Sequence, residues 1–163
     1  MGIFRLRAEP CGKLAQICRA LGHLCQPQLR NLAVHLSLIA LLVRDYDEAL
    51  AYFVDRLGFA LIEDRPLSSA KRWVVVAPDR DAQTRILLAK AVGPVQEAAI
   101  GDQSGGRVFL FLTTEDFPKR HAELVSRGVT FLETPRTEPY GMVAVFADLY
   151  GNRWDLIGPS PPA

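Results

Sequence analysis

Long hydrophobic runs and an excess of charge of either sign are both missing from this 163-residue sequence. Its 19 Lys and Arg residues are balanced by 18 Asp and Glu residues, which gives a formal net charge of +1. No apolar run approaches the roughly 18 residues of a membrane-spanning helix, and the N-terminus lacks the apolar core of a signal peptide. The dispersed basic residues form no one-sided stripe for nucleic acid phosphates. We therefore expect a soluble, cytoplasmic protein with no nucleic acid and no membrane partner.

Cysteine is scarce, and its spacing is unsuited to cross-linking. The three cysteines, Cys11, Cys18 and Cys25, lie seven residues apart. On a helix this spacing separates neighbours by about 10.5 Å, which is too far for a disulfide or for shared metal ligation. Apolar residues recur every three or four positions between Cys11 and Cys25, which predicts a short amphipathic helix. This helix belongs to an extension, residues 1–35, and it either docks on the body, docks on a second subunit, or has no settled place.

The rest of the chain contains one unit twice. The apolar run Leu38–Val43 recurs as Arg107–Leu112 at an offset of 69 residues, and Gly58-Phe59 recurs as Gly128-Val129 at an offset of 70. An open solenoid needs at least three stacked repeats, so a repeat that occurs only twice predicts a duplicated module whose halves enclose one site.

Each copy predicts a strand, a helix and three further strands. Asp45 has the form of a helix start and Gly58 fits the helix stop. The first module, residues 36–90, is predicted to hold strands at 36–43, 59–63, 72–77 and 84–89 and a helix at 45–57. The second module, 106–158, is predicted to hold strands at 107–113, 129–132, 142–147 and 153–157 and a helix at 115–127, and residues 159–163 form a tail. We therefore expect an α+β fold of two tandem βαβββ modules.

These modules resemble the vicinal oxygen chelate superfamily. The resemblance rests on the opening Ile-Ala-Leu-Leu-Val-Arg-Asp-Tyr-Asp-Glu-Ala at 39–49 and the close Phe-Ala-Asp-Leu-Tyr-Gly-Asn-Arg-Trp-Asp-Leu-Ile at 146–157, and it covers about residues 36–158. The superfamily includes glyoxalase I, bleomycin resistance proteins, fosfomycin resistance enzymes and extradiol dioxygenases. The resemblance implies a cup-shaped mixed sheet with helices outside, and a homodimer in which modules pair. Function varies widely on this scaffold.

The resemblance also implies where a divalent metal would bind. Enzymes of the superfamily hold it with His, Gln or Glu side chains on the first and last strands of each module. The corresponding positions here are Leu38, Leu87, Arg107 and Asp155, of which only Asp155 has a side chain that can ligate a divalent metal. Strand alternation places His35 on the face opposite Leu38, so it is a poor replacement. We therefore expect no metal and no cofactor, with a divalent metal ion as the alternative.

Other residues at the implied site are candidates for binding a small molecule. Arg107 and Asp155 are expected to form an ion pair in place of the cation, serving either as a structural plug or as a polar anchor for a ligand. Alternation from Arg107 adds two phenylalanines to the cup, and two further aromatic residues lie near strand starts, where a pocket mouth is expected. The candidate ligand-binding residues are Arg107, Asp155, Phe109, Phe111, Trp73 and Tyr140.

Two functions follow from these residues. The first is a glyoxalase/bleomycin resistance-like protein that binds a small, partly apolar molecule in its cup without the usual divalent metal. The alternative is an enzyme: a metal-dependent glyoxalase-like lyase, isomerase or dioxygenase, or a metal-independent enzyme with Asp155 or Tyr140 as the acid or base. The sequence does not name the ligand.

Overall fold

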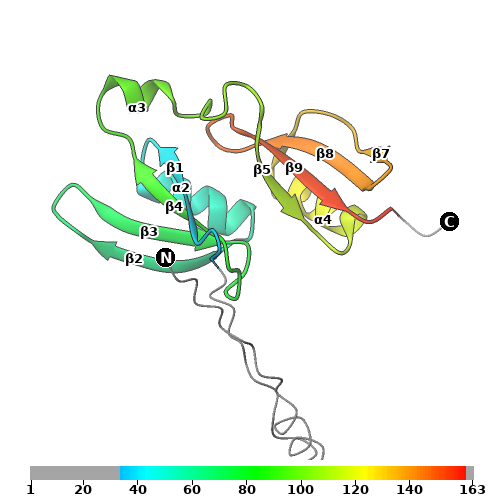
Figure 1. The fold of residues 1–163 in the computed structure, drawn as a ribbon, viewed down its shortest axis with the longest axis horizontal. Coiled ribbons are helices and arrows are strands. Elements are labelled where there is room, and N and C mark those ends of the chain that lie inside the picture. Colours follow the sequence, from blue (N-terminus) through cyan, green and yellow to red (C-terminus); the bar gives the residue numbers. More distant parts are fainter. Residues whose placement is uncertain (1–33, 161–163) are drawn as a thin grey trace, which may run out of the picture. The chain divides into compact units, whose positions relative to one another are not determined.

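The computed structural model of the protein describes residues 34–160, of which residues 35–160 belong to one compact unit. The helix expected between Cys11 and Cys25 lies outside the described residues. The expected α+β fold of two βαβββ modules is confirmed, with one mixed sheet in each module (Figure 1).

The first module begins with β1 (Leu38–Val43) and continues into a helical segment formed by α2 (Tyr46–Leu50) and the π-helical turns η1 (Ala51–Arg56). Its remaining strands are β2 (Ala60–Pro66), β3 (Arg72–Ala77) and β4 (Arg85–Lys90). The sheet has the order β1-β4-β3-β2, in which β1 runs parallel to β4 and the other pairs are antiparallel. Strand β4 is therefore an interior strand of this sheet.

The second module repeats this plan with an additional strand. It consists of β5 (Val108–Thr113), α4 (Phe117–Ser126), β6 (Thr130–Phe131), β7 (Arg136–Glu138), β8 (Gly141–Ala147) and β9 (Arg153–Gly158). The order is β5-β9-β8-β6, and β7 also pairs with β8. Neither β7 nor the short helix α3 (Pro94–Ala98) between the modules was predicted from the sequence.

Local hydrogen bonds explain where the helices begin and end. The Asp45 carboxylate accepts from the backbone N–H groups of Asp47 and Glu48, and these bonds lower the pKa of Asp45. Asp116 caps α4 in the same way, by accepting from the N–H of Lys119. The first helical segment ends before Gly58, whose φ of +69° lies in the left-handed region that favours glycine. The expected start and stop are both confirmed.

The two modules share one hydrophobic core on the helical side of their sheets. Leu41 and Val43 of β1 are fully buried there, whereas Ala40 between them is exposed. Phe53 of η1 packs against Trp154 of β9, with ring centroids 6.1 Å apart. The Tyr52 hydroxyl donates to the Ala147 carbonyl across 3.0 Å and thereby links the modules. We call the other face of each sheet, which the helices do not cover, the open face.

Two polar side chains fix the connections around this core. Gln103, in the linker between the modules, accepts from the Leu42 N–H at 2.7 Å and donates to the Ala40 carbonyl at 3.3 Å. It thereby forms hydrogen bonds with backbone groups on the outer edge of β1. Asp148, in the turn between β8 and β9, is buried and accepts from three backbone N–H groups and from the side chains of Asn152 and Trp154.

Among the helices of residues 34–160, none is long and apolar enough to cross a membrane.

Candidate functional site

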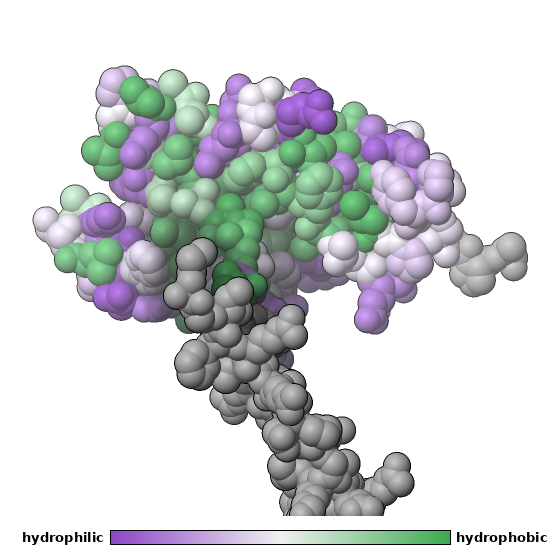
Figure 2. Space-filling view, in the orientation of Figure 1, coloured by the Kyte–Doolittle hydropathy of each residue, from purple (hydrophilic) through white to green (hydrophobic). Residues whose placement is uncertain are grey.

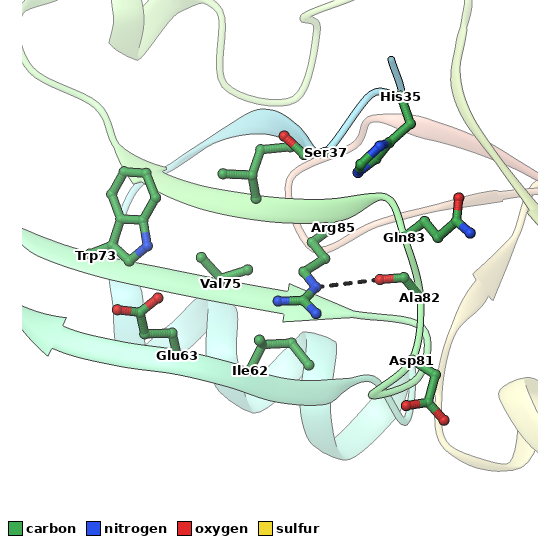
Figure 3. Close-up of a pocket in the computed structure, with 11 residues that line it drawn as sticks. His35, Ser37, Ile62, Glu63, Trp73, Val75, Asp81, Ala82, Gln83 and Arg85 are labelled. Atoms are coloured by element: carbon green, nitrogen blue, oxygen red, sulfur yellow. Dashed lines mark hydrogen bonds between the residues drawn. The ribbon is translucent and has the colours of Figure 1, made fainter. Parts of the chain in front are cut away.

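A pocket of about 470 Å³ lies on the open face of the first sheet (Figure 3). This volume is within the range of roughly 300–1,000 Å³ that is typical of small-molecule sites. Apolar walls come from Leu38 on β1, Trp73 and Val75 on β3, and Ile62 on β2. The turn between β3 and β4 closes one end. Trp73, which was expected near a pocket mouth, lines this pocket, and its role in ligand binding stays a prediction.

Arg85 is the central charged residue of this pocket, and the sequence reasoning did not select it. It is the first residue of β4 and lies opposite Leu38 of β1 in the parallel register. Its Nε donates to the Ala82 carbonyl at 3.4 Å. Figure 3 shows the guanidinium between the side chains of Val75 and Ile62. Alternation backwards from Leu87 names Arg85 as a residue of the open face, so the signal was present in the sequence.

His35 also borders this pocket, which corrects the expectation that it lies on the face opposite Leu38. Strand alternation applies only within a strand, and β1 begins at Leu38. Residues 34–37 have no regular structure, and His35, Ser37 and Leu38 all line the same pocket.

On the open face of the second sheet, Asp155 and Phe111 lie side by side. They are partners in the register of β9 and β5. Phe111 is 63% exposed, whereas Asp155 is only 7% exposed and its Oδ1 atom has no hydrogen-bond partner among the described residues. Burial raises the pKa of Asp155, and the positive charge of Arg136 lowers it to a smaller extent. The second sheet therefore presents a poorly solvated carboxylate next to an exposed aromatic ring.

The expected ion pair between Arg107 and Asp155 is wrong. Within residues 34–160 no ion pair joins them, and the cation that acts on Asp155 is Arg136 of β7. Arg136 itself pairs with Glu133 and Glu138. Arg107 is exposed and precedes β5, which starts at Val108.

The expected position of Phe109 in the cup is also wrong. A bulge between Val108 and Leu110 interrupts the pairing of β5 with β9, so that alternation counted from Arg107 fails at Phe109. Phe109 consequently packs against the core, while Phe111, beyond the bulge, keeps its expected face.

The structure does not gather all the candidate residues around one pocket. Trp73 lines the first-sheet pocket, whereas Phe111, Asp155, Arg107 and Tyr140 belong to the second module and are not part of its lining. Tyr140 is 65% exposed and directly precedes β8.

The residues at the implied metal positions do not fit a divalent cation. Leucine offers no lone pair at positions 38 and 87, and the guanidinium of Arg107 repels a cation. In the part of the chain that the structure describes, no three His, Cys, Asp or Glu side chains lie close enough together to hold a metal ion.

Comparison with known proteins places these features in a family. The sequence profile of the Glyoxalase/Bleomycin resistance protein/Dioxygenase superfamily matches residues 35–156. An uncharacterized protein of Shewanella frigidimarina (strain NCIMB 400) is 50% identical over 120 residues, which cover 73% of this chain and 89% of that protein. The uncharacterized protein YurT of Bacillus subtilis (strain 168) is 31% identical over 119 residues, covering 72% of this chain and 94% of its own length.

Among solved structures, TnmS3, an antibiotic binding protein from Streptomyces sp. CB03234, has a TM-score of 0.64 and 31% identity, covering 79% of this chain and 98% of that chain. UcmS2 has a TM-score of 0.68 and 28% identity, and the match covers 77% of this chain and 98% of that chain.

Proposed function

Because this chain belongs to the Glyoxalase/Bleomycin resistance protein/Dioxygenase superfamily, we propose that it binds a small, partly apolar molecule in the first-sheet pocket without a divalent metal ion. The observation that carries this proposal is the pocket itself, with its volume of about 470 Å³ and its apolar walls. The similarity to an antibiotic binding protein supports binding as the function. A metal-dependent lyase, isomerase or dioxygenase would need ligands at positions that hold Leu38, Leu87 and Arg107.

We also propose that the protein is a homodimer in which the second sheet's open face is covered by another copy. The 63% exposed Phe111 ring supports this, because removing the apolar surface of an aromatic ring from water would stabilise the dimer. Figure 2 shows hydrophobic residues gathered across the middle of one face, between more hydrophilic ends. In such a dimer Asp155 and Phe111 would contact the partner or the ligand, and Arg107 and Tyr140 would lie at the rim. The cytoplasmic location stays a prediction.

A neutral fluorescent probe, N-phenyl-1-naphthylamine, tests the binding function. Trp73 is half-buried in the pocket, whereas Trp154 is 2% exposed in the core, so a bound probe should quench Trp73 selectively. We expect saturable probe fluorescence together with tryptophan quenching, and loss of that quenching in Trp73→Phe. Ser37→Phe should block the pocket, while Ser160→Phe, at an exposed position near the C-terminus, should leave binding unchanged.

Failure of the probe to bind, or binding that Ser37→Phe leaves intact, would contradict the proposal. Quenching that persists in Trp73→Phe would place the probe somewhere other than this pocket.

A further inference from the structure

We propose that the first-sheet pocket selects molecules that carry a carboxylate on a flat apolar body, and that Arg85 is the residue that recognises the carboxylate. This inference rests on the proposed function and adds the charge of the ligand to it. In the part of the chain that the structure describes, most of the N–H donors of the Arg85 guanidinium have no acceptor.

These N–H donors lie on the two terminal nitrogens of Arg85. A guanidinium has five N–H donors, and within residues 34–160 only Nε of Arg85 has an acceptor, the Ala82 carbonyl. Among residues 34–160, no carboxylate forms an ion pair with Arg85. The terminal nitrogens form the planar fork that binds a carboxylate through two parallel hydrogen bonds.

The acidic residues of the pocket leave this fork available. Figure 3 shows Glu63 and Asp81 at opposite ends of the pocket, with the Arg85 guanidinium between them. Glu63 already accepts from Arg65 Nε at 2.7 Å, so its charge is compensated. Asp81 is exposed, in the turn before β4. The centre of the pocket is therefore its most favourable position for an anion.

The backbone holds Arg85 in place for this task. Its N–H donates to the Ser37 carbonyl at 2.9 Å, and β4 is paired on both sides, with β1 and β3. Residues on rigid strands are positioned more precisely than residues on loops, so the backbone of Arg85 is fixed before a ligand binds. The flat apolar body of that ligand would lie along Trp73, Val75 and Leu38, which line the same pocket. The site thus combines a positioned cation with an apolar, partly aromatic wall.

Two probes of the same shape and different charge test the proposal: 2-naphthoate, which is ionised at pH 7, and its neutral analogue 2-naphthamide. Binding is measured by Trp73 quenching and by calorimetry. Because a charge-assisted pair in a half-open pocket contributes modestly, we expect naphthoate to bind about tenfold more tightly than naphthamide.

Variants of Arg85 identify the source of that preference. Arg85→Met should abolish the preference for naphthoate over naphthamide by weakening the binding of naphthoate alone. Arg85→Lys should keep only part of this preference, because an ammonium lacks the planar fork. Lys119→Met removes the same charge from the exposed face of α4 and should leave the preference unchanged. Circular dichroism establishes that each variant is folded. If Arg85→Met does not fold, the preference of the wild-type protein and its reduction in Arg85→Lys still test whether Arg85 recognises the carboxylate.

Equal binding of the two probes by the wild-type protein would overturn the carboxylate inference and leave the binding function standing. A preference that survives in Arg85→Met, or disappears in Lys119→Met, would overturn it as well. If neither probe binds at millimolar concentration, the binding function fails together with the inference.

Discussion

Replacing Asp155 with Asn should stabilise the protein at pH 7. The Asp155 carboxylate is 7% exposed, and its Oδ1 atom has no hydrogen-bond partner in residues 34–160. A buried polar atom without a partner costs about 1–3 kcal/mol, more when it is charged, and the positive charge of Arg136 offsets part of this cost. Asn keeps the shape and removes the charge. We expect a gain on the order of 1 kcal/mol, or about 4 °C in Tm for a domain of this size.

The gain should depend on pH in a defined direction. Burial raises the pKa of Asp155 in the folded protein above its ordinary value of 3.8, so folding disfavours the ionised form. The penalty is fully present above the folded pKa and disappears as the pH falls below the ordinary value, where the carboxyl is neutral in both the folded and the unfolded state. The Tm difference between Asp155→Asn and wild type should therefore be largest at pH 7 and shrink towards pH 4.

Thermal denaturation followed by circular dichroism at pH 7, 5.5 and 4 measures this difference. Asp148→Asn is the matched control, because the Asp148 carboxylate accepts hydrogen bonds from both the backbone and side chains and should lose stability on substitution. A lower Tm for Asp155→Asn at pH 7, or a difference that does not change with pH, would show that the buried carboxylate does not destabilise the folded protein. A carboxylate kept at a cost in stability is typical of a functional position.

Three further predictions concern the fold and the assembly. Gly141→Ala should lower the free energy of unfolding, measured in urea, by about 3 kcal/mol, because its φ is +136° and a Cβ would lie 2.2 Å from a carbonyl oxygen of β9. The control Gly105→Ala, at φ +62° with open space around it, should lower it by about 1 kcal/mol. Equal costs would contradict the role of the close approach to β9. Tyr52→Phe should lower the same free energy by about 1 kcal/mol, because it removes the hydrogen bond to β8, and an unchanged value would mean that this bond does not stabilise the module contact. Phe111→Ser should shift sedimentation velocity profiles from dimer to monomer, whereas Val125→Ser, at another exposed apolar position, should not; a monomeric wild type would remove the dimer proposal.

The sequence predicted the fold because its local signals were explicit. Asp45 marked the helix start, Gly58 marked its end, and the repeat doubled every element of the first module. Short elements carried no such signal. Strand β7 has three residues, Arg136–Glu138, and no alternation of apolar residues, so neither the strand nor the charge that it places near Asp155 was foreseen.

The candidate site was less predictable because its details depend on irregular backbone. Counting alternate residues from Arg107 assumed an uninterrupted strand, and the bulge before Leu110 moved Phe109 onto the core. Counting backwards from Leu38 assumed that the strand extended to His35, which instead borders the pocket. Trp73 was selected because it lies near a strand start, and it lines the pocket from the start of the regular strand β3. Alternation is reliable within a strand and loses its meaning at the ends and at bulges.

Calorimetric titration of 2-naphthoate into the full chain, before and after treatment with a chelator, would show whether the pocket binds a ligand without a metal. We expect saturable binding at one site per chain with the same Kd in both samples, because the pocket residues bind the ligand without a metal. Absence of binding of 2-naphthoate and of neutral N-phenyl-1-naphthylamine would contradict the pocket as a ligand site. Binding that is lost with the chelator and restored by nickel, zinc, manganese or iron(II) would contradict metal-free binding and favour the metal-dependent enzyme.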